Sequence, residues 1–205
     1  MNIKERLSTK NNNFRLPYTD PFLLEAMSNK ITSWLPKYPR NYIVICIGTD
    51  RSTGDSLGPL TGSFLNELRP KYLNIHGTLH DPIHAQNLTK HINLIKRQYK
   101  DPFIIAIDAC LGRSKAVGNI ITGLGPLKPG AALNKDLPSI GNIHITGVVN
   151  ISGFMEYAIL QNTRLSVVID MSKKIASILN HIDQQLTFHY SPAAILLSDK
   201  EEFNI

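Results

Sequence analysis

Two uninterrupted apolar runs, each followed by an aspartate-bearing segment, dominate the hydrophobic pattern of the chain. The first run spans residues 42–47 and leads into the glycine-rich turn 48–58, and the second spans 103–107 and leads directly to Asp108. Apolar runs of this length without alternation predict strands covered on both faces, as in a parallel sheet between helices. Ligands bind such sheets in the crevice outside the carboxyl ends of the strands. The pattern therefore predicts a site that both aspartate-bearing segments share.

The rest of the pattern predicts helices alternating with strands. Apolar residues at helical spacing predict helices over residues 21–35, 56–68, 83–99, 153–160 and 163–182, and apolar runs predict further strands over 72–79, 117–124 and 143–149. The short run 165–169 is equally compatible with a strand. The β-α-β-α-β order of the first half implies right-handed crossovers and a parallel sheet.

Length and composition predict one domain with polar ends. The 205 residues are sufficient for one substantial core. Residues 1–40 are expected to form an arm, loose to about residue 20, and a docking helix. Residues 41–190 are expected to form the single α/β domain, and 191–205 a C-terminal tail.

Charge and cysteine usage exclude several classes of protein. The net charge is +6, but the densest cluster, 96–100, holds only three positive charges, which favours a solvated surface over a nucleic-acid site. No run approaches the roughly 20 apolar residues that span a membrane, and residues 1–16 lack the apolar stretch of a signal peptide. Cys46 and Cys110 lie in or beside predicted strands without CxxC spacing, which is typical of reduced core thiols. We therefore expect a cytoplasmic protein with no nucleic-acid or membrane partner.

Asp55 and Asp108 are the candidate catalytic residues. Two carboxylates that lie close together can share a proton, so that one acts as a base on water while the other donates a proton to the substrate. With a histidine added, the same pair is a divalent metal site. Asp55 is alternatively the cap of the helix that begins at Ser56.

Other polar residues lie near the predicted strand ends. His84 follows the second strand and either faces the crevice or is a surface or cap residue. Asn150 follows the last strand and either orients a water or the substrate, or caps the next helix. The turn 48–58 lacks both the GxxxxGK[ST] lysine and GxGxxG spacing, so its glycines indicate a sharp turn with a close approach rather than a phosphate loop.

Several segments together resemble a known family. GDSLGP at 54–59 resembles the Pro-Asp-Ala-Leu-Gly-Pro turn of the spore germination protease, and IDACLGR at 107–113 resembles its Ile-Asp-Ala-Leu segment. Residues 129–135 and 139–150 resemble its later Pro-Gly…Asn-Lys and Gly-Ile-Pro stretches. Over roughly residues 40 to 182, the chain resembles the YyaC-type sporulation proteins, which are similar to the germination protease and more remotely to hydrogenase-maturation endopeptidases.

This resemblance implies a three-layer αβα sandwich with a mostly parallel sheet, of the phosphorylase/hydrolase type. It implies that the domain at 41–190 is peptidase-like, with an aspartate-dependent peptidase mechanism and Asp55 and Asp108 as catalytic residues. The substrate would be a protein or peptide, such as the small acid-soluble spore proteins, in the forespore or spore core. The chain shows no obvious propeptide, and the stretch near Asn150 lacks the histidine that the hydrogenase-maturation relatives use for nickel. We therefore expect no metal and no cofactor.

The expected site combines these residues in a peptidase. We expect backbone N–H groups around Gly54 and Gly58 to stabilise the oxyanion, and His84 and Asn150 to bind substrate. A homo-oligomer is compatible with this prediction. Two alternatives stay open: a metal-assisted peptidase that uses His84 with the two aspartates, and a non-enzymatic spore-assembly or binding protein on the same fold.

Overall fold

A six-stranded sheet in the order β1-β5-β6-β4-β2-β3 forms the centre of the molecule. The structure, a computed structural model, describes residues 13–36, 41–129 and 137–189. The strands are β1 (Asn13–Pro17), β2 (Tyr42–Cys46), β3 (Leu73–His76), β4 (Phe103–Gly112), β5 (Asn119–Leu124) and β6 (Ile143–Ile151). The helices are α2 (Leu23–Thr32), α3 (Leu57–Glu67), α4 (Leu88–Gln98), α5 (Glu156–Gln161) and α6 (Leu165–His189), with 3₁₀ turns η1 (Gly54–Ser56) and η2 (Ser114–Ala116).

The sheet is mostly parallel, as predicted. Strands β3, β2, β4 and β6 pair in parallel, whereas β5 is antiparallel to β6 and β1 is antiparallel to β5. The reversal at β5 follows from the short connection after β4, because a parallel return needs a crossover of a dozen or more residues. The fold is thus an α/β fold in which the antiparallel pairs occupy one edge of the sheet.

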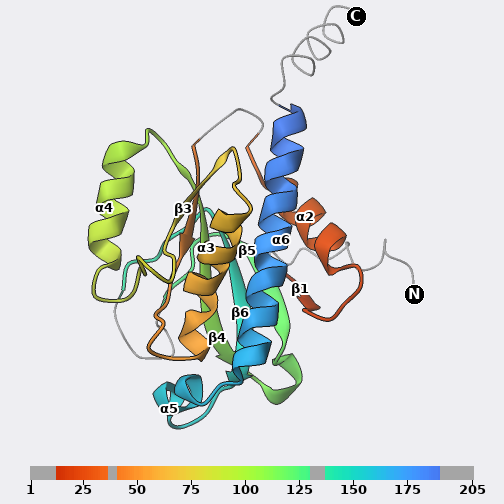
Figure 1. The fold of residues 1–205 in the computed structure, drawn as a ribbon, viewed down its shortest axis with the longest axis vertical. Helices are drawn as coiled ribbons and strands as arrows, with labels where there is room; N and C mark the ends of the chain where they lie inside the picture. Colours follow the sequence, from red (N-terminus) through yellow and green to blue (C-terminus); the bar gives the residue numbers. More distant parts are fainter. Residues whose placement is uncertain (1–12, 37–40, 130–136, 190–205) are drawn as a thin grey trace, which may run out of the picture.

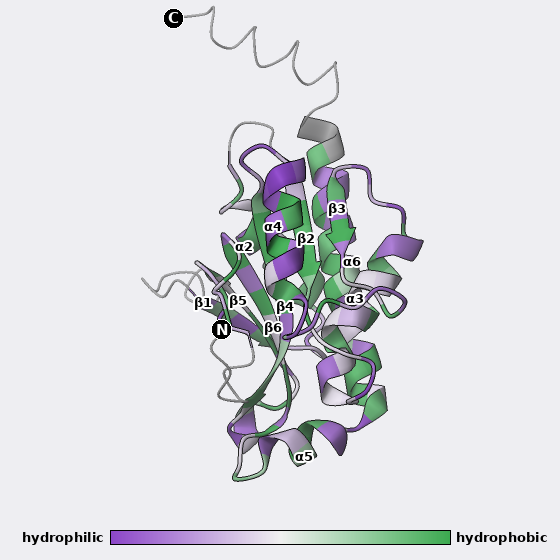
Figure 2. Ribbon diagram, turned by 90° about the vertical axis from the view of Figure 1, so that its left-hand side faces the viewer, coloured by the Kyte–Doolittle hydropathy of each residue, from purple (hydrophilic) through white to green (hydrophobic). Residues whose placement is uncertain are grey.

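Helices cover both faces of the sheet (Figure 1). Along β2, Ile43 and Ile45 pack with α4, whereas Val44 and Cys46 pack on the opposite face with α2, α3 and α6. Figure 2 shows the hydrophobic strands inside this arrangement and the alternating hydrophobic and hydrophilic bands of α4. The predicted three-layer αβα arrangement is therefore confirmed. No helix in the described parts of the chain is both long and apolar enough to cross a membrane.

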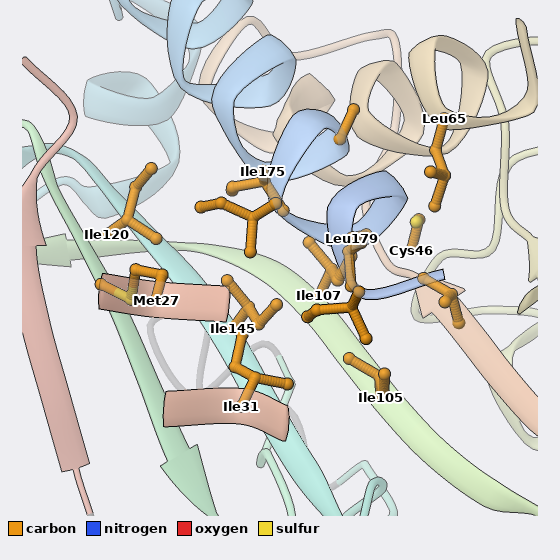
Figure 3. Packing of buried hydrophobic residues seen from close by; sticks show 14 of the residues in the cluster. Met27, Ile31, Cys46, Leu65, Ile105, Ile107, Ile120, Ile145, Ile175 and Leu179 are labelled. Carbon is orange, nitrogen blue, oxygen red and sulfur yellow. The ribbon is translucent and has the colours of Figure 1, made fainter. Parts of the chain in front are cut away.

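The larger of the two cores lies beneath α2 and α6. Figure 3 shows Met27 of α2 and Ile175 and Leu179 of α6 packed over Ile107 and Ile145 of the sheet. All of these side chains are buried, and burying a side chain of this size stabilises a fold by roughly 1.5–3 kcal/mol. The helix α6 begins at Leu165, so the alternative of a strand over 165–169 is wrong.

The polar N-terminal segment contains a strand that the pattern did not predict. Residues 13–17 form β1 rather than part of a loose arm, and they pair with the edge of the sheet at β5. Leu16 is the buried residue of β1, and the remaining side chains of the strand are half-buried or exposed. Phe14 also packs against the core, so β1 does alternate apolar and polar side chains, but two apolar residues in a polar segment are too short a pattern to predict a strand. Residues 1–12 and the expected tail 191–205 lie outside the described residues.

A buried aspartate joins α6 to the start of β3. Both carboxylate oxygens of Asp183 accept hydrogen bonds from backbone N–H groups, from Lys71 at 2.8 Å, Tyr72 at 2.7 Å and Leu73 at 3.0 Å. Asp183 is 3% exposed. Because buried polar groups need partners, these bonds offset the cost of burying the carboxylate and fix the beginning of the strand.

Candidate functional site

The turn after β2 is shaped by two close backbone contacts. Gly48 has φ +147°, and a Cβ there would lie 1.9 Å from the carbonyl oxygen of Asp55. The N–H of Thr49 donates to that same oxygen at 3.2 Å. A Cβ at Gly58 would lie 2.1 Å from the carbonyl oxygen of Ile47, so α3 packs directly against the end of the strand. These two glycines thus allow Asp55 to lie beside the carboxyl end of β2. The contacts agree with the prediction of a sharp turn with a close backbone approach.

Asp108 lies inside β4 and not after its end. The strand was expected to stop at residue 107, but its backbone pairing with β6 continues, with Asp108 opposite Thr146. Side chains alternate along a strand, so Asp108 shares the α4 face with Ile104 and Ala106. Its carboxylate accepts the N–H of Ala109 at 2.8 Å. The aspartate is 9% exposed, because the strand continues past it.

A pocket of about 290 Å³ brings the two aspartates and His84 together. It lies at the carboxyl end of β2, where the parallel pairing of β2 with β4 ends and where the parallel sheet predicts a crevice. Its further lining residues are Ile47, Gly48, Thr49, Asp50, Arg51, Ser52, Pro82, Ala85, Gln86, Pro129, Leu137 and Tyr157. Residues far apart in the chain therefore meet at one site that contains Asp55, Asp108 and His84.

His84 lies in the connection between β3 and α4. The predicted helix over 83–99 begins only at residue 88, because Ile83 forms a bridge to Ile47 and extends the sheet. The N–H of His84 donates to the side chain of Asn87 at 2.8 Å, and its ring Nδ1 accepts the N–H of Gln86 at 3.3 Å. A neutral imidazole that accepts through Nδ1 carries its proton on Nε2. The ring thus offers the pocket a hydrogen-bond donor.

The donor set does not fit a divalent metal ion. Within residues 13–36, 41–129 and 137–189, no three His, Cys, Asp or Glu side chains are grouped closely enough to hold one. Coordination through Nε2 of His84 would also require its proton to move to Nδ1, at the expense of the bond from Gln86. The arrangement favours a site that works through carboxylates and an imidazole N–H.

Gly54, Gly58 and Asn150 are not among the described residues that line the pocket. A Cβ at Gly54 would meet the side chain of Leu160 at 2.8 Å, so this glycine allows the segment that follows β6 to pack closely. The Asn150 side chain donates to the carbonyl oxygen of Ile159 at 3.2 Å and to Oγ1 of Thr163 at 3.3 Å. It thereby ties the end of β6 to the segment that carries α5.

Twelve of the residues that line the pocket were not among the candidates from the sequence, and six of them have polar side chains: Thr49, Asp50, Arg51, Ser52, Gln86 and Tyr157. Arg51 and Ser52 belong to the glycine-rich turn, and their position between its glycines is the sequence signal that could have identified them as lining residues. Gln86 lies two residues after His84, and Tyr157 comes from α5. Only folding brings Tyr157 beside the end of β2, so no local pattern could have identified it.

Both cysteines are free thiols of low acidity. Cys46 is fully buried, and burial raises its pKa far above the ordinary value. Burial raises the pKa of Cys110 to about 11; its hydrogen bond with Thr146 acts in the opposite direction, and the charge of Asp108 is the smallest of the three causes and adds to the rise. Thiols of this kind are protonated at neutral pH, so neither is an activated nucleophile. The prediction of unreactive core thiols holds for Cys46, and Cys110 is only partly buried.

Comparisons with known sequences support the resemblance to the YyaC-type proteins. The family described as "Protein of unknown function (DUF1256)" matches residues 15–178. The chain is 49% identical over 168 residues to the "Uncharacterized protein YyaC" of Bacillus subtilis (strain 168), with 82% of each chain covered. A structure of the [NiFe] hydrogenase maturation protease HycI from Thermococcus kodakarensis KOD1 is similar at a TM-score of 0.49 and 14% identity, over 75% of this chain and 98% of that one. The YyaC-type resemblance is confirmed.

Proposed function

This chain belongs to the DUF1256 family, and we propose that it is a metal-independent endopeptidase whose catalytic residues are Asp55 and Asp108. One observation carries the proposal: both carboxylates line a single pocket at the point where the parallel pairing of β2 and β4 ends. The motifs around both aspartates also resemble those of the germination protease. A pair of carboxylates in one cavity suits hydrolysis, because one can act as base while the other acts as acid.

The proposed reaction begins with one proton shared between the two carboxylates, since two like charges in one site cannot both ionise at low cost. The ionised aspartate removes a proton from a water molecule as the water oxygen attacks the peptide carbonyl carbon. The protonated aspartate donates to the carbonyl oxygen, and a tetrahedral intermediate forms. The C–N bond then breaks as the leaving nitrogen takes up a proton from the carboxyl pair.

His84 is the donor that we assign to the developing oxyanion. Its Nε2–H is available because Nδ1 accepts the bond from Gln86. Such donors stabilise charge that develops in the transition state and commonly contribute about 10²–10³ in rate. The N–H groups around Gly54 and Gly58 were expected in this role, but neither glycine is among the described lining residues.

We propose a polypeptide substrate of the small acid-soluble spore protein type, cleaved in the forespore or spore core. The support is the resemblance of the motifs at 54–59 and 107–113 to those of the germination protease.

A second candidate function is protein binding without hydrolysis, on the same fold. It is favoured by the exposed apolar side chains near α5, where Phe154 is fully exposed, Met155 is 68% exposed and Tyr157 is 56% exposed. Exposed apolar groups that cluster in this way are typical of interaction sites. Tyr157 also lines the pocket, so a bound partner would contact both features.

The decisive experiment is proteolysis of a purified small acid-soluble spore protein, with and without a chelator. The variants are Asp55→Asn and Asp108→Asn, and the matched control is Asp170→Asn, an exposed aspartate of α6. We expect cleavage that survives the chelator, is lost in both site variants and persists in the control. Loss of cleavage with the chelator would contradict a metal-independent reaction. Binding of the spore protein without cleavage, equally strong in the wild type and in both site variants, would instead establish the second function.

A further inference from the structure

Ser52 has the only buried side-chain polar atom without a hydrogen-bond partner in the described part of the chain. Its side chain is 3% exposed, and its Oγ contacts no donor or acceptor there. Almost all buried polar atoms in native proteins are paired, and an unpaired hydroxyl is costly. Ser52 also lines the pocket that holds Asp55 and Asp108. The unpaired hydroxyl is therefore part of the wall of the proposed active site.

Ser56 lies one helical turn further on and is also buried, but its hydroxyl has the hydrogen-bond partner that the hydroxyl of Ser52 lacks within the described residues. Ser56 Oγ donates to the carbonyl oxygen of Thr53 at 2.6 Å. The N–H of Ser56 donates to the backbone carbonyl oxygen of Ser52 at 3.0 Å, so the backbone of Ser52 is held by the same turn. A hydrogen bond thus holds the backbone of Ser52 in place, whereas its side-chain hydroxyl has no partner within the described residues.

We propose that Ser52 is a substrate-binding residue whose hydroxyl hydrogen-bonds to a backbone amide group of the bound polypeptide. This inference rests on the proposed function, because it takes a peptide as the occupant of the pocket. A hydroxyl can donate to a peptide carbonyl or accept from a peptide N–H, so it suits either edge of an extended segment. The pocket is also lined by the apolar residues Ile47, Pro82 and Leu137, against which the apolar parts of a polypeptide can pack.

A nucleophilic role for Ser52 does not agree with its contacts. An attacking serine is activated by a base within hydrogen-bond reach. Ser52 Oγ has no such partner among the described residues, and Nδ1 of His84 already accepts a backbone N–H. Ser52 is three residues from Asp55, on the same turn. The position suits holding the substrate beside the aspartates, so that the carbonyl to be attacked is oriented before the reaction.

The test compares Ser52→Ala with the matched control Ser56→Ala. We measure thermal unfolding of the free proteins, kcat and KM for the spore protein, and its direct binding by calorimetry. Removing the unpaired hydroxyl leaves the melting temperature of Ser52→Ala equal to or above that of the wild type, and raises KM about tenfold with kcat within about twofold. Removing the paired hydroxyl in Ser56→Ala lowers the melting temperature and leaves KM unchanged. Ser52→Cys, which keeps the shape with a weak donor, has an intermediate KM.

The outcomes separate this inference from the peptidase proposal. If Ser52→Ala melts at a lower temperature, as Ser56→Ala does, and keeps the wild-type KM, the hydroxyl is structural and the inference is overturned. A fall in kcat alone also overturns it, because the hydroxyl would then act only in the transition state. If the wild type binds the spore protein without cleaving it, and Ser52→Ala binds it more weakly, the binding role stands and the peptidase proposal fails. If the wild type neither binds nor cleaves it, both are overturned.

Discussion

Two buried aspartates lie at opposite ends of the parallel strands, Asp183 of α6 beside the start of β3 and Asp108 in β4 near the carboxyl end of β2, and their surroundings differ. At the start of β3, both oxygens of Asp183 are occupied by backbone N–H groups of residues 71–73. In β4, near the carboxyl end of the sheet, Asp108 accepts the N–H of Ala109 and lines a pocket. Both are buried to a similar degree, at 3% and 9% exposure. Burial alone therefore does not distinguish the two aspartates, whereas their surroundings do, and the catalytic role that we propose for Asp108 rests on those surroundings.

The largest expected effect, a loss of catalysis without a loss of stability, follows from replacing Asp108. We expect Asp108→Asn to lower kcat for the spore protein by about 10³-fold, since a general acid or base contributes about 10²–10⁴. The amide fills the same volume, so the free energy of unfolding in urea should change by less than about 1 kcal/mol. Normal cleavage by Asp108→Asn, or unfolding of this variant under assay conditions, would contradict the proposed difference between Asp108 and Asp183.

Replacing Asp183 should have the opposite effect. In Asp183→Ala, the backbone N–H groups of Lys71, Tyr72 and Leu73 lose their acceptor. We expect the free energy of unfolding to fall by about 3 kcal/mol, because unpaired buried donors cost roughly 1–3 kcal/mol each and partial exposure to water offsets some of this. Urea unfolding measures the loss. Activity per folded molecule, assayed well below the melting temperature, stays at the wild-type value if the residue is only structural.

Gly48 connects stability with the site, so its replacement should affect both. In Gly48→Ala, the new Cβ meets the carbonyl oxygen of Asp55, and the backbone must leave φ +147°. We expect a loss of about 2 kcal/mol in stability and a displaced Asp55 that lowers kcat.

The matched control is Gly125→Ala, where φ is +94° but no atom lies within 4 Å of the new Cβ. It carries conformational strain alone, of about 1 kcal/mol, and should leave kcat unchanged. An equal loss of activity in both glycine variants would show that the contact with Asp55 does not matter for the site.

The smallest expected effect is on the thiol beside Asp108. The charge of Asp108 contributes to raising the pKa of Cys110, so Asp108→Asn should lower that pKa and speed alkylation by iodoacetamide between pH 7 and 9. Because burial is the larger cause, we expect only a several-fold change in rate. Cys46, which is fully buried, is the internal control and should stay unmodified. An unchanged rate at Cys110 would indicate that Asp108 is not charged at these pH values.

Much of the fold was predictable from local patterns. The runs at 42–47 and 103–107 correspond to β2 and β4, and apolar residues at helical spacing predicted α2 and α3 to within three residues and the start of α6 to within two, although α6 and β4 both continue well past their predicted ends. The same patterns placed Asp55, Asp108 and His84 at the carboxyl edge of the sheet, and the structure brings all three into one pocket. These predictions succeeded because a strand or helix that buries one face must repeat apolar residues at its own period.

Other features were decided only by the tertiary structure, because they depend on residues that are distant in the chain. Strand β1 forms because β5 offers a free edge, and Asp108 lies inside a strand because β6 continues the backbone pairing past it. The unpaired hydroxyl of Ser52 and the approach of Tyr157 to the pocket likewise appear only when separate elements pack together. Sequence periodicity determines which faces are buried, whereas backbone pairing and the surroundings of a polar atom depend on the residues that the whole fold brings alongside it.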